Sequence, residues 1–123
     1  IDHLAEAARK APDLTAFRAR GGKLLLFHGW ADPLVTPQRT LEYYAAVRTT
    51  MGGAESTARF ARLFMLPGVD HCGLQPGPGA KSIEFDPLPA LEAWVERDEA
   101  PAALNVRWQM TDGSVRKRAV TPQ

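Results

Sequence analysis

The chain has 123 residues, a length that suits one domain with a modest core and leaves no room for a second full domain. Its hydrophobic fraction of 45% and charged fraction of 24% are ordinary for a globular protein. A formal net charge of +1 gives no general attraction to nucleic acid or to an anionic membrane, so neither is expected as a partner. Because no run of about 18 apolar residues occurs, the sequence predicts no membrane span.

The first residues and the single cysteine both bear on whether the chain is part of a longer protein. Ile1-Asp2-His3 contains neither an initiating methionine nor the basic and apolar parts of a signal peptide, which predicts a start inside a longer protein. Cys72 is the only cysteine and cannot form an internal disulfide. It is therefore a buried thiol, a reactive thiol, or half of a bridge to a segment outside this sequence.

The first part of the chain predicts helix followed by strand. Residues 2–10 have helical spacing of apolar residues, and Asp13 is a suitable N-cap for a further short turn. After Gly21-Gly22, residues 23–27 (KLLLF) form a continuous apolar run, which is typical of a strand buried on both faces of a parallel sheet. This strand leads into a loop over residues 28–33.

A helix, a second strand and a Gly/Pro-rich loop follow. Thr36 is a possible cap with Pro37 at the first helical position, and apolar residues then recur with helical spacing up to Met51-Gly52-Gly53. Residues 62–66 form the second buried-strand candidate. Residues 73–79 are rich in Gly and Pro and predict irregular structure.

The last part of the chain predicts one more helix and a tail. Asp86-Pro87 opens a helix that ends near Arg97, with apolar residues along one face. These apolar residues are Leu88, Leu91, Trp94 and Val95. In the tail, apolar and polar residues alternate weakly on either side of Asp112-Gly113. This pattern suggests a hairpin turn there.

The alternation of helices and strands predicts an α/β fold with a parallel sheet. Two buried strands with their helices do not close a core, so we expect the chain to be part of a larger sheet. We predict that residues 1–104 are one portion of such a domain and residues 105–123 a C-terminal tail. No internal repeat is present, and the glycines form no phosphate-binding pattern.

Two residues that could do chemistry follow the two predicted strands. Asp32 and His71 lie where the carboxyl ends of parallel strands converge on a crevice. An acid after one strand and a histidine after the next is the arrangement that completes a Ser-Asp-His triad in hydrolases of that chain order. Each residue also has a simpler interpretation, because an Asp-Pro pair often forms a turn and a loop histidine often only bonds backbone. Asp70 is expected to cap the loop.

A nucleophile is not evident. None of the three serines, Ser56, Ser82 and Ser114, lies in a G-x-S-x-G elbow, and all three are interpreted as turn residues. Cys72 is adjacent in sequence to its prospective base, which is a poor position for proton transfer. The histidines and the cysteine lack zinc-ligand spacing, so no metal site is predicted.

Several segments together resemble the tannase and feruloyl esterase family of α/β-hydrolases. They are residues 13–22 (DLTAFRARGG), 23–39 (KLLLFHGWADPLVTPQR), 51–53 (MGG), 61–79 (ARLFMLPGVDHCGLQPGPG) and 85–97 (FDPLPALEAWVER). The resemblance implies the C-terminal part of an α/β-hydrolase fold, incomplete on its own, from a serine esterase of aromatic-acid esters such as gallates or hydroxycinnamates. It also implies that Asp32 is the triad acid and His71 the triad base.

The same resemblance implies further features of the parent protein. Cys72 would be disulfide-bonded to a cysteine directly before the catalytic serine, outside this chain, and the parent would be secreted or periplasmic. The serine and a lid domain with a possible structural calcium would lie upstream, so no cofactor is expected here and this chain alone would be inactive. Trp30 is a candidate for the pocket border. Association through the unpaired sheet edge or through Cys72 is possible.

Two other functions fit the same residues. A prolyl-oligopeptidase-like serine hydrolase also has an HGxxD loop and a later G-x-x-H loop, although the cysteine after His71 argues against it. Alternatively, the chain is a non-catalytic remnant or binding module that has the fold without a nucleophile.

Overall fold

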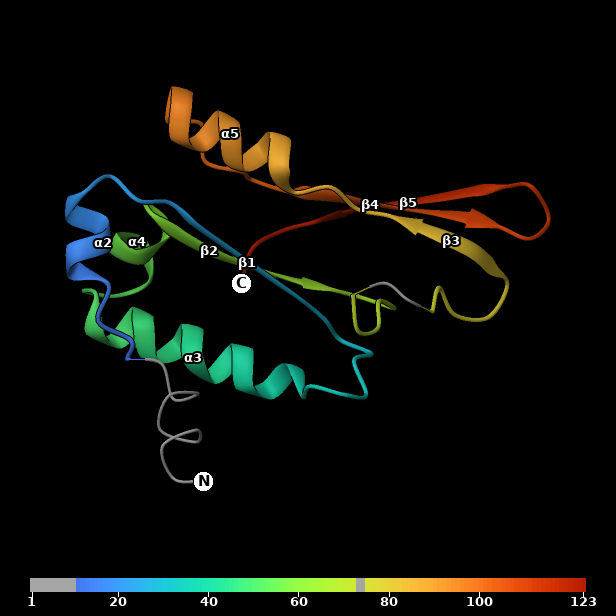
Figure 1. The fold of residues 1–123 in the computed structure, drawn as a ribbon, viewed down its shortest axis with the longest axis horizontal. Coiled ribbons are helices and arrows are strands. Elements are labelled where there is room, and N and C mark those ends of the chain that lie inside the picture. Colours follow the sequence, from blue (N-terminus) through green and yellow to red (C-terminus); the bar gives the residue numbers. More distant parts are fainter. Residues whose placement is uncertain (1–10, 73–74) are drawn as a thin grey trace.

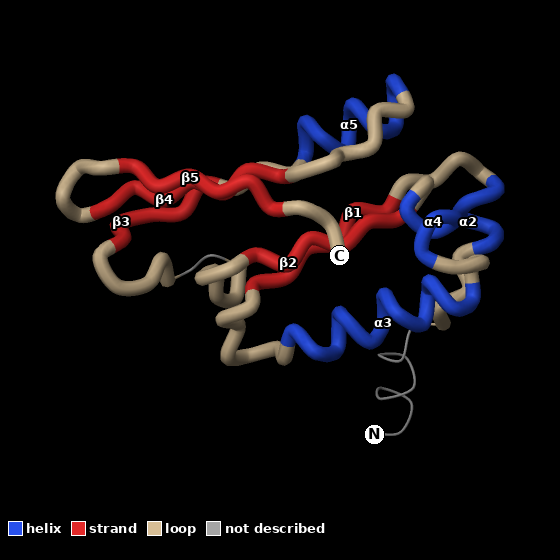
Figure 2. Tube along the Cα trace, turned by 180° about the vertical axis from the view of Figure 1, so that it is seen from behind, coloured by secondary structure: helices blue, strands red, loops and turns tan. Residues whose placement is uncertain are grey.

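The computed structural model describes residues 11–72 and 75–123. Along the chain the elements are α2 (Thr15–Ala19), β1 (Leu24–Gly29), α3 (Pro37–Thr50), α4 (Ala54–Ala58), β2 (Ala61–Leu66), β3 (Ala80–Glu84), α5 (Leu88–Arg97), β4 (Leu104–Met110) and β5 (Val115–Val120). Figures 1 and 2 show helix α3 on one side of the β1–β2 pair and the strands β3 to β5 on the other. The helix predicted over residues 2–10 lies outside the described residues.

Strands β1 and β2 pair in parallel, as the sequence predicts, in a register that runs from Leu24 opposite Ala61 to Gly29 opposite Leu66. The crossover between them contains α3 and α4, which is the usual way to connect parallel neighbours. Strand β1 extends two residues beyond the predicted range, so His28 and Gly29 belong to the strand and not to the loop.

The core consists of two layers separated by β2. Leu63 and Met65 pack with α3, whereas Phe64 and Leu66 pack with β4 and β5, because successive side chains on a strand point to opposite faces. The prediction of a strand buried on both faces therefore holds for β2 but is wrong for β1. In β1 the side chain of Phe27 is 47% exposed, since β2 is its only strand neighbour within residues 11–72 and 75–123.

Helix α3 begins as the sequence predicts, with the Thr36 hydroxyl accepting a hydrogen bond from the backbone N–H of Gln38. Its buried face is fixed to β2 by the Tyr44 hydroxyl, which donates to the carbonyl of Ala61 at 2.8 Å. Helix α2 begins later than predicted. Its N-cap is Leu14, and the carboxylate of Asp13 accepts the N–H of Thr15.

The second sheet contains a strand that the sequence analysis missed. Strand β3 pairs antiparallel with β4, so Ser82 lies in a strand and not in a loop. Its residues (AKSIE) do not alternate cleanly between apolar and polar, and it is the ladder with β4 that makes it a strand. Ser56 is likewise inside a helix, α4, and is not a turn residue. Residues 75–79 contain no helix or strand.

The tail forms a hairpin, with β4 and β5 antiparallel on either side of Asp112-Gly113. Its strands are not detached, because Leu104, Val106 and Val120 are buried against β2. The predicted division of the chain at residue 104 stays a prediction.

Helix α5 carries one fully buried side chain, Trp94. The cations of Lys23 and Arg62 lie 5.9 Å and 5.8 Å from the centroid of the Trp94 ring system, which adds a cation–π contribution to its burial. Leu88 and Val95, which the sequence places on the same apolar face, are more than half exposed. Ala90 of the same helix packs against the core layer that contains Phe64 and Leu66.

Candidate active site

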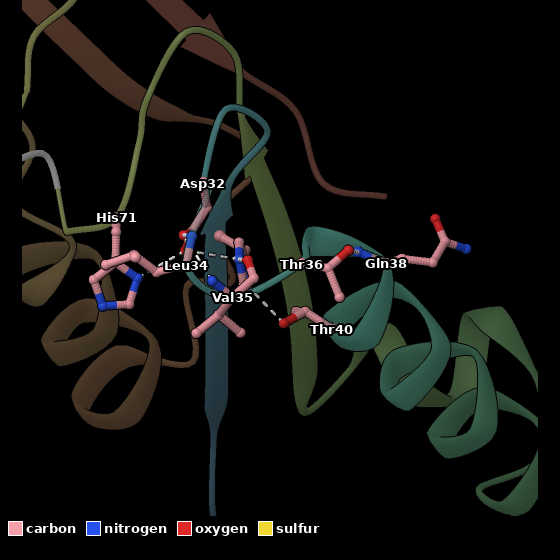
Figure 3. A network of polar contacts seen from close by, with 8 residues as sticks. Asp32, Leu34, Val35, Thr36, Gln38, Thr40 and His71 are labelled. Atoms are coloured by element: carbon pink, nitrogen blue, oxygen red, sulfur yellow. Dashed lines mark hydrogen bonds and ion pairs between the residues drawn. The ribbon is translucent and has the colours of Figure 1, made fainter.

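Asp32 and His71 meet at the carboxyl ends of the two parallel strands. The Nδ1 atom of His71 lies 2.9 Å from Oδ2 of Asp32, although the two residues are 39 positions apart in the sequence. Figure 3 shows the imidazole facing the Asp32 carboxylate, with the start of helix α3 on the other side of the acid. Because a carboxylate only accepts, Nδ1 carries the proton and donates it to Asp32.

The two loops meet because Gly29 allows a close backbone approach. A Cβ atom at Gly29 would lie only 2.1 Å from the carbonyl oxygen of Val69. The backbone N–H of Trp30 donates to Leu66 at 2.9 Å, and the N–H of Ala31 donates to Val69 at 3.0 Å. These bonds join the loop of the acid to the loop of the histidine.

The two oxygens of Asp32 have different partners. Oδ1 accepts the backbone N–H groups of Leu34 and Val35, both at 2.9 Å, which closes the turn at Pro33. Oδ2 accepts from His71. Both sequence interpretations of this aspartate, turn former and partner of a histidine, therefore describe its contacts.

The pKa of Asp32 is set by opposing effects. Burial, which leaves the side chain 5% exposed, raises the pKa. Hydrogen bonds from Val35, His71 and Leu34 to the charged form outweigh burial and lower the pKa from 3.8 to about 2. The carboxylate is therefore ionised at every pH at which an ordinary aspartate would be.

His28 is a member of this cluster that the sequence analysis did not propose. Its Nε2 lies 3.1 Å from Oδ2 of Asp32 and 3.0 Å from the carbonyl oxygen of Val35, and its Nδ1 lies 2.8 Å from the hydroxyl of Thr40. The sequence does contain a sign of this role. His28 directly follows the apolar run LLLF and stands four positions before Asp32.

His71 lines a cavity of about 400 Å³. The apolar residues around this cavity are Phe27, Leu66, Val69, Ile83, Phe85 and Pro87. With Nδ1 bound to Asp32, the Nε2 atom is the unprotonated nitrogen in the neutral ring, and the side chain remains 34% exposed. The site thus offers a base, oriented by an acid, beside an apolar space.

Of the other residues singled out in the sequence, Cys72 and Asp70 line this cavity and Trp30 does not. Cys72 lines it as an exposed free thiol in the left-handed region, with φ of 58°. Asp70 accepts the N–H of Gln75 at 2.8 Å, as expected for a residue that caps the loop. Trp30 is 48% exposed and is not among the described residues that line the cavity, so its place at a pocket border stays a prediction.

No serine of this chain is among the described residues around the cavity. Among residues 11–72 and 75–123, no group of three or more His, Cys, Asp or Glu side chains could hold a metal ion. A larger cavity of about 680 Å³ lies between β5 and the loop of Pro76, but it contains no acid–base pair. The Asp32–His71 pair lines the smaller cavity.

These observations define a chain that presents an acid and a base at the ends of parallel strands. A family model described as "Tannase and feruloyl esterase" matches residues 3–122. The chain belongs to the tannase and feruloyl esterase family, as the sequence motifs indicate. No helix in the described part of the chain is long and apolar enough to cross a membrane.

Three relatives of this chain carry the names of a hydrolase, a feruloyl esterase and a tannase. The chain is 46% identical over 101 residues to a mono(2-hydroxyethyl) terephthalate hydrolase of Piscinibacter sakaiensis, covering 82% of this chain and 15% of that protein. It is 45% identical over 93 residues to a probable feruloyl esterase of Arthroderma benhamiae, covering 76% and 17%. A tannase of Aspergillus oryzae is 36% identical over 104 residues, covering 76% and 17%.

Solved structures agree with this relationship. The tannin acyl hydrolase from Aspergillus niger superposes with a TM-score of 0.81 at 26% identity, covering 99% of this chain and 24% of that one. Feruloyl esterase B from Aspergillus oryzae superposes with a TM-score of 0.76 at 27% identity, covering 91% and 25%. The chain therefore spans about a quarter or less of the length of these relatives.

Proposed function

We propose that this chain is the C-terminal part of an α/β-hydrolase fold and supplies the acid and the base of a Ser-His-Asp triad in a carboxylic ester hydrolase. The observation that carries the proposal is the 2.9 Å contact between Asp32 and His71 beside an apolar cavity. The nucleophilic serine is assigned to a segment outside these 123 residues, because none of the serines present lines that cavity.

The mechanism follows from the protonation of His71. Its Nε2 accepts the serine proton as the serine oxygen bonds to the ester carbonyl carbon, and the imidazolium then donates that proton to the departing alcohol oxygen. A water molecule hydrolyses the acyl-enzyme by the same two proton transfers. Asp32 holds Nδ1 and stabilises the imidazolium, a task that requires the ionised carboxylate that its low pKa ensures.

Esters of aromatic acids are the proposed substrates. The names of the relatives and of a solved structure point to a terephthalate ester, feruloyl esters and tannin as substrates, and the acyl groups of all three contain an aromatic ring. The cavity beside His71 has two phenylalanines, Phe27 and Phe85, whose rings pack edge to face at 5.0 Å. An aromatic acyl group fits an apolar, aromatic-lined space of this kind.

The test uses the protein that contains this chain together with its upstream segment. We expect hydrolysis of methyl ferulate or methyl gallate and a single fluorophosphonate adduct on a serine outside these residues. His71→Ala should abolish both. If the adduct forms on Ser56, Ser82 or Ser114, or if His71→Ala keeps normal turnover, the assignment is wrong.

The same experiment separates the two other candidate functions. A peptidase of the prolyl-oligopeptidase type would cleave peptides in preference to esters, which the family relationship argues against. A non-catalytic remnant would give neither hydrolysis nor an adduct in the protein with its upstream segment. Activity of the isolated chain is not informative, since we propose that it lacks the nucleophile.

We further propose that Cys72 is bonded to a cysteine beside that serine, in a parent protein that is secreted or periplasmic. The thiol is exposed and next to the base, where a covalent link would limit drift of His71. In the oxidised parent, Cys72 should resist alkylation by iodoacetamide until the protein is reduced. Alkylation of the unreduced, folded parent at Cys72 would contradict the bridge.

A further inference from the structure

We propose that His28 is a positioning residue of the triad, and that Thr40 holds the His28 ring in place through Nδ1. The inference rests on the proposed esterase function and assigns to it a residue that touches neither the substrate nor the nucleophile. It arises from three contacts of one imidazole, whose side chain is 11% exposed at the end of β1.

The contacts of His28 determine where its proton lies. Nε2 faces the Asp32 carboxylate at 3.1 Å and the Val35 carbonyl at 3.0 Å, and neither of these oxygens can donate. Nε2 therefore carries the hydrogen. In the neutral ring Nδ1 is then an acceptor, and its partner at 2.8 Å is the Thr40 hydroxyl, which donates.

His28 holds the loop of Asp32 through Val35. Its Nε2–H bonds the Val35 carbonyl at 3.0 Å, and the N–H of the same Val35 donates to Oδ1 of Asp32 at 2.9 Å. Nε2 of His28 also lies 3.1 Å from Oδ2, the oxygen that accepts from His71. His28 thus fixes the turn whose N–H groups hold the carboxylate that orients His71.

The activity test uses the full protein with its upstream serine. His28→Ala should lower kcat by about 30-fold, and Thr40→Val by about 5-fold, with KM within about twofold of wild type, because small displacements of catalytic groups are costly in rate. His28→Gln keeps an N–H near the Nε2 position and should recover most of kcat. The matched control is Thr49→Val at the far end of α3, where the hydroxyl bonds only Ala45.

A second measurement does not depend on turnover. Imidazole ¹⁵N shifts should show His28 as the Nε2–H tautomer in wild type, in Thr49→Val and in Thr40→Val, with the Nδ1 resonance displaced only in Thr40→Val, because that variant loses the hydroxyl at Nδ1. An Nδ1–H tautomer in wild type would overturn the proposal, as would folded His28→Ala or Thr40→Val with wild-type kcat. If wild type hydrolyses no ester but shows the expected tautomer, the esterase assignment fails while the hydrogen-bonding geometry stands.

Discussion

His71 Nδ1 and Asp32 Oδ2 lie 2.9 Å apart, while the other oxygen of the same aspartate closes a turn through the N–H groups of Leu34 and Val35. One carboxylate therefore shapes its own loop and orients the base on a neighbouring loop. Because both functions depend on the charged form, the low pKa of Asp32 follows from the same bonds that hold it in place.

Asp32→Asn should remove the negative charge opposite His71 without emptying the site. We expect kcat for ester hydrolysis in the full protein to fall by about 10³- to 10⁴-fold, because the imidazolium loses its partner and the ring can adopt the wrong tautomer. KM should change much less. Initial rates over a range of ester concentrations separate the two constants.

The matched control for that substitution is Asp112→Asn. Asp112 also accepts hydrogen bonds from a residue two positions ahead, Ser114, but it lies in the exposed hairpin turn. This variant should hydrolyse the ester like wild type. An equal loss of kcat in both variants would contradict a specific role for Asp32.

The stability of the protein should respond to acid through Asp32. Its folded pKa, about 2, is below the ordinary value of 3.8, so its contribution is fully present above about pH 4 and is lost as the pH falls toward 2. Urea unfolding of wild type and Asp32→Asn at several pH values measures the difference between their free energies. That difference should shrink from about pH 5 to about pH 2.5, and a constant difference would show that ionised Asp32 does not stabilise the fold.

Gly29→Ala should disturb the contact between the two loops, because the added Cβ would meet the Val69 carbonyl at 2.1 Å. The variant should lose about 3 kcal/mol of unfolding free energy, since backbone must move to relieve the clash. Gly68→Ala is the control. A Cβ atom at Gly68 has no neighbour within 4 Å. This variant should lose only about 1 kcal/mol of unfolding free energy, because Gly68 has a positive φ of 69°. Urea unfolding compares the two, and equal losses would exclude the close approach as the cause.

Tyr44→Phe should test the link between α3 and β2. It removes a buried hydroxyl that donates to the Ala61 carbonyl at 2.8 Å, which should cost about 1 to 2 kcal/mol of unfolding free energy. The neighbouring Tyr43→Phe, at a partly buried residue on the same helix, should change stability by less than about 0.5 kcal/mol. Thermal or urea unfolding of both variants provides the comparison, and the prediction fails if Tyr43→Phe is the more harmful.

Local sequence patterns predicted the elements that have a continuous apolar run or a clear helix start. The apolar runs predicted at residues 23–27 and 62–66 are strands, observed as Leu24–Gly29 and Ala61–Leu66, and Thr36-Pro37 begins a helix. Strand β3 was missed because its residues lack alternation and depend on β4 for pairing. The burial of β1 was predicted too strongly, since a sequence run shows that a strand is apolar but not how many neighbours cover it.

By itself, the sequence determined the family and the order of acid and histidine along the chain, because motifs such as HGWADPL and PGVDHCG are local and specific. It also placed Asp32 and His71 after consecutive strands. Only the tertiary structure decided that His28 and Thr40 belong to the same cluster. Their hydrogen bonds join β1, the loop after it and α3 through side-chain directions, and these depend on how the elements pack and not on residue spacing.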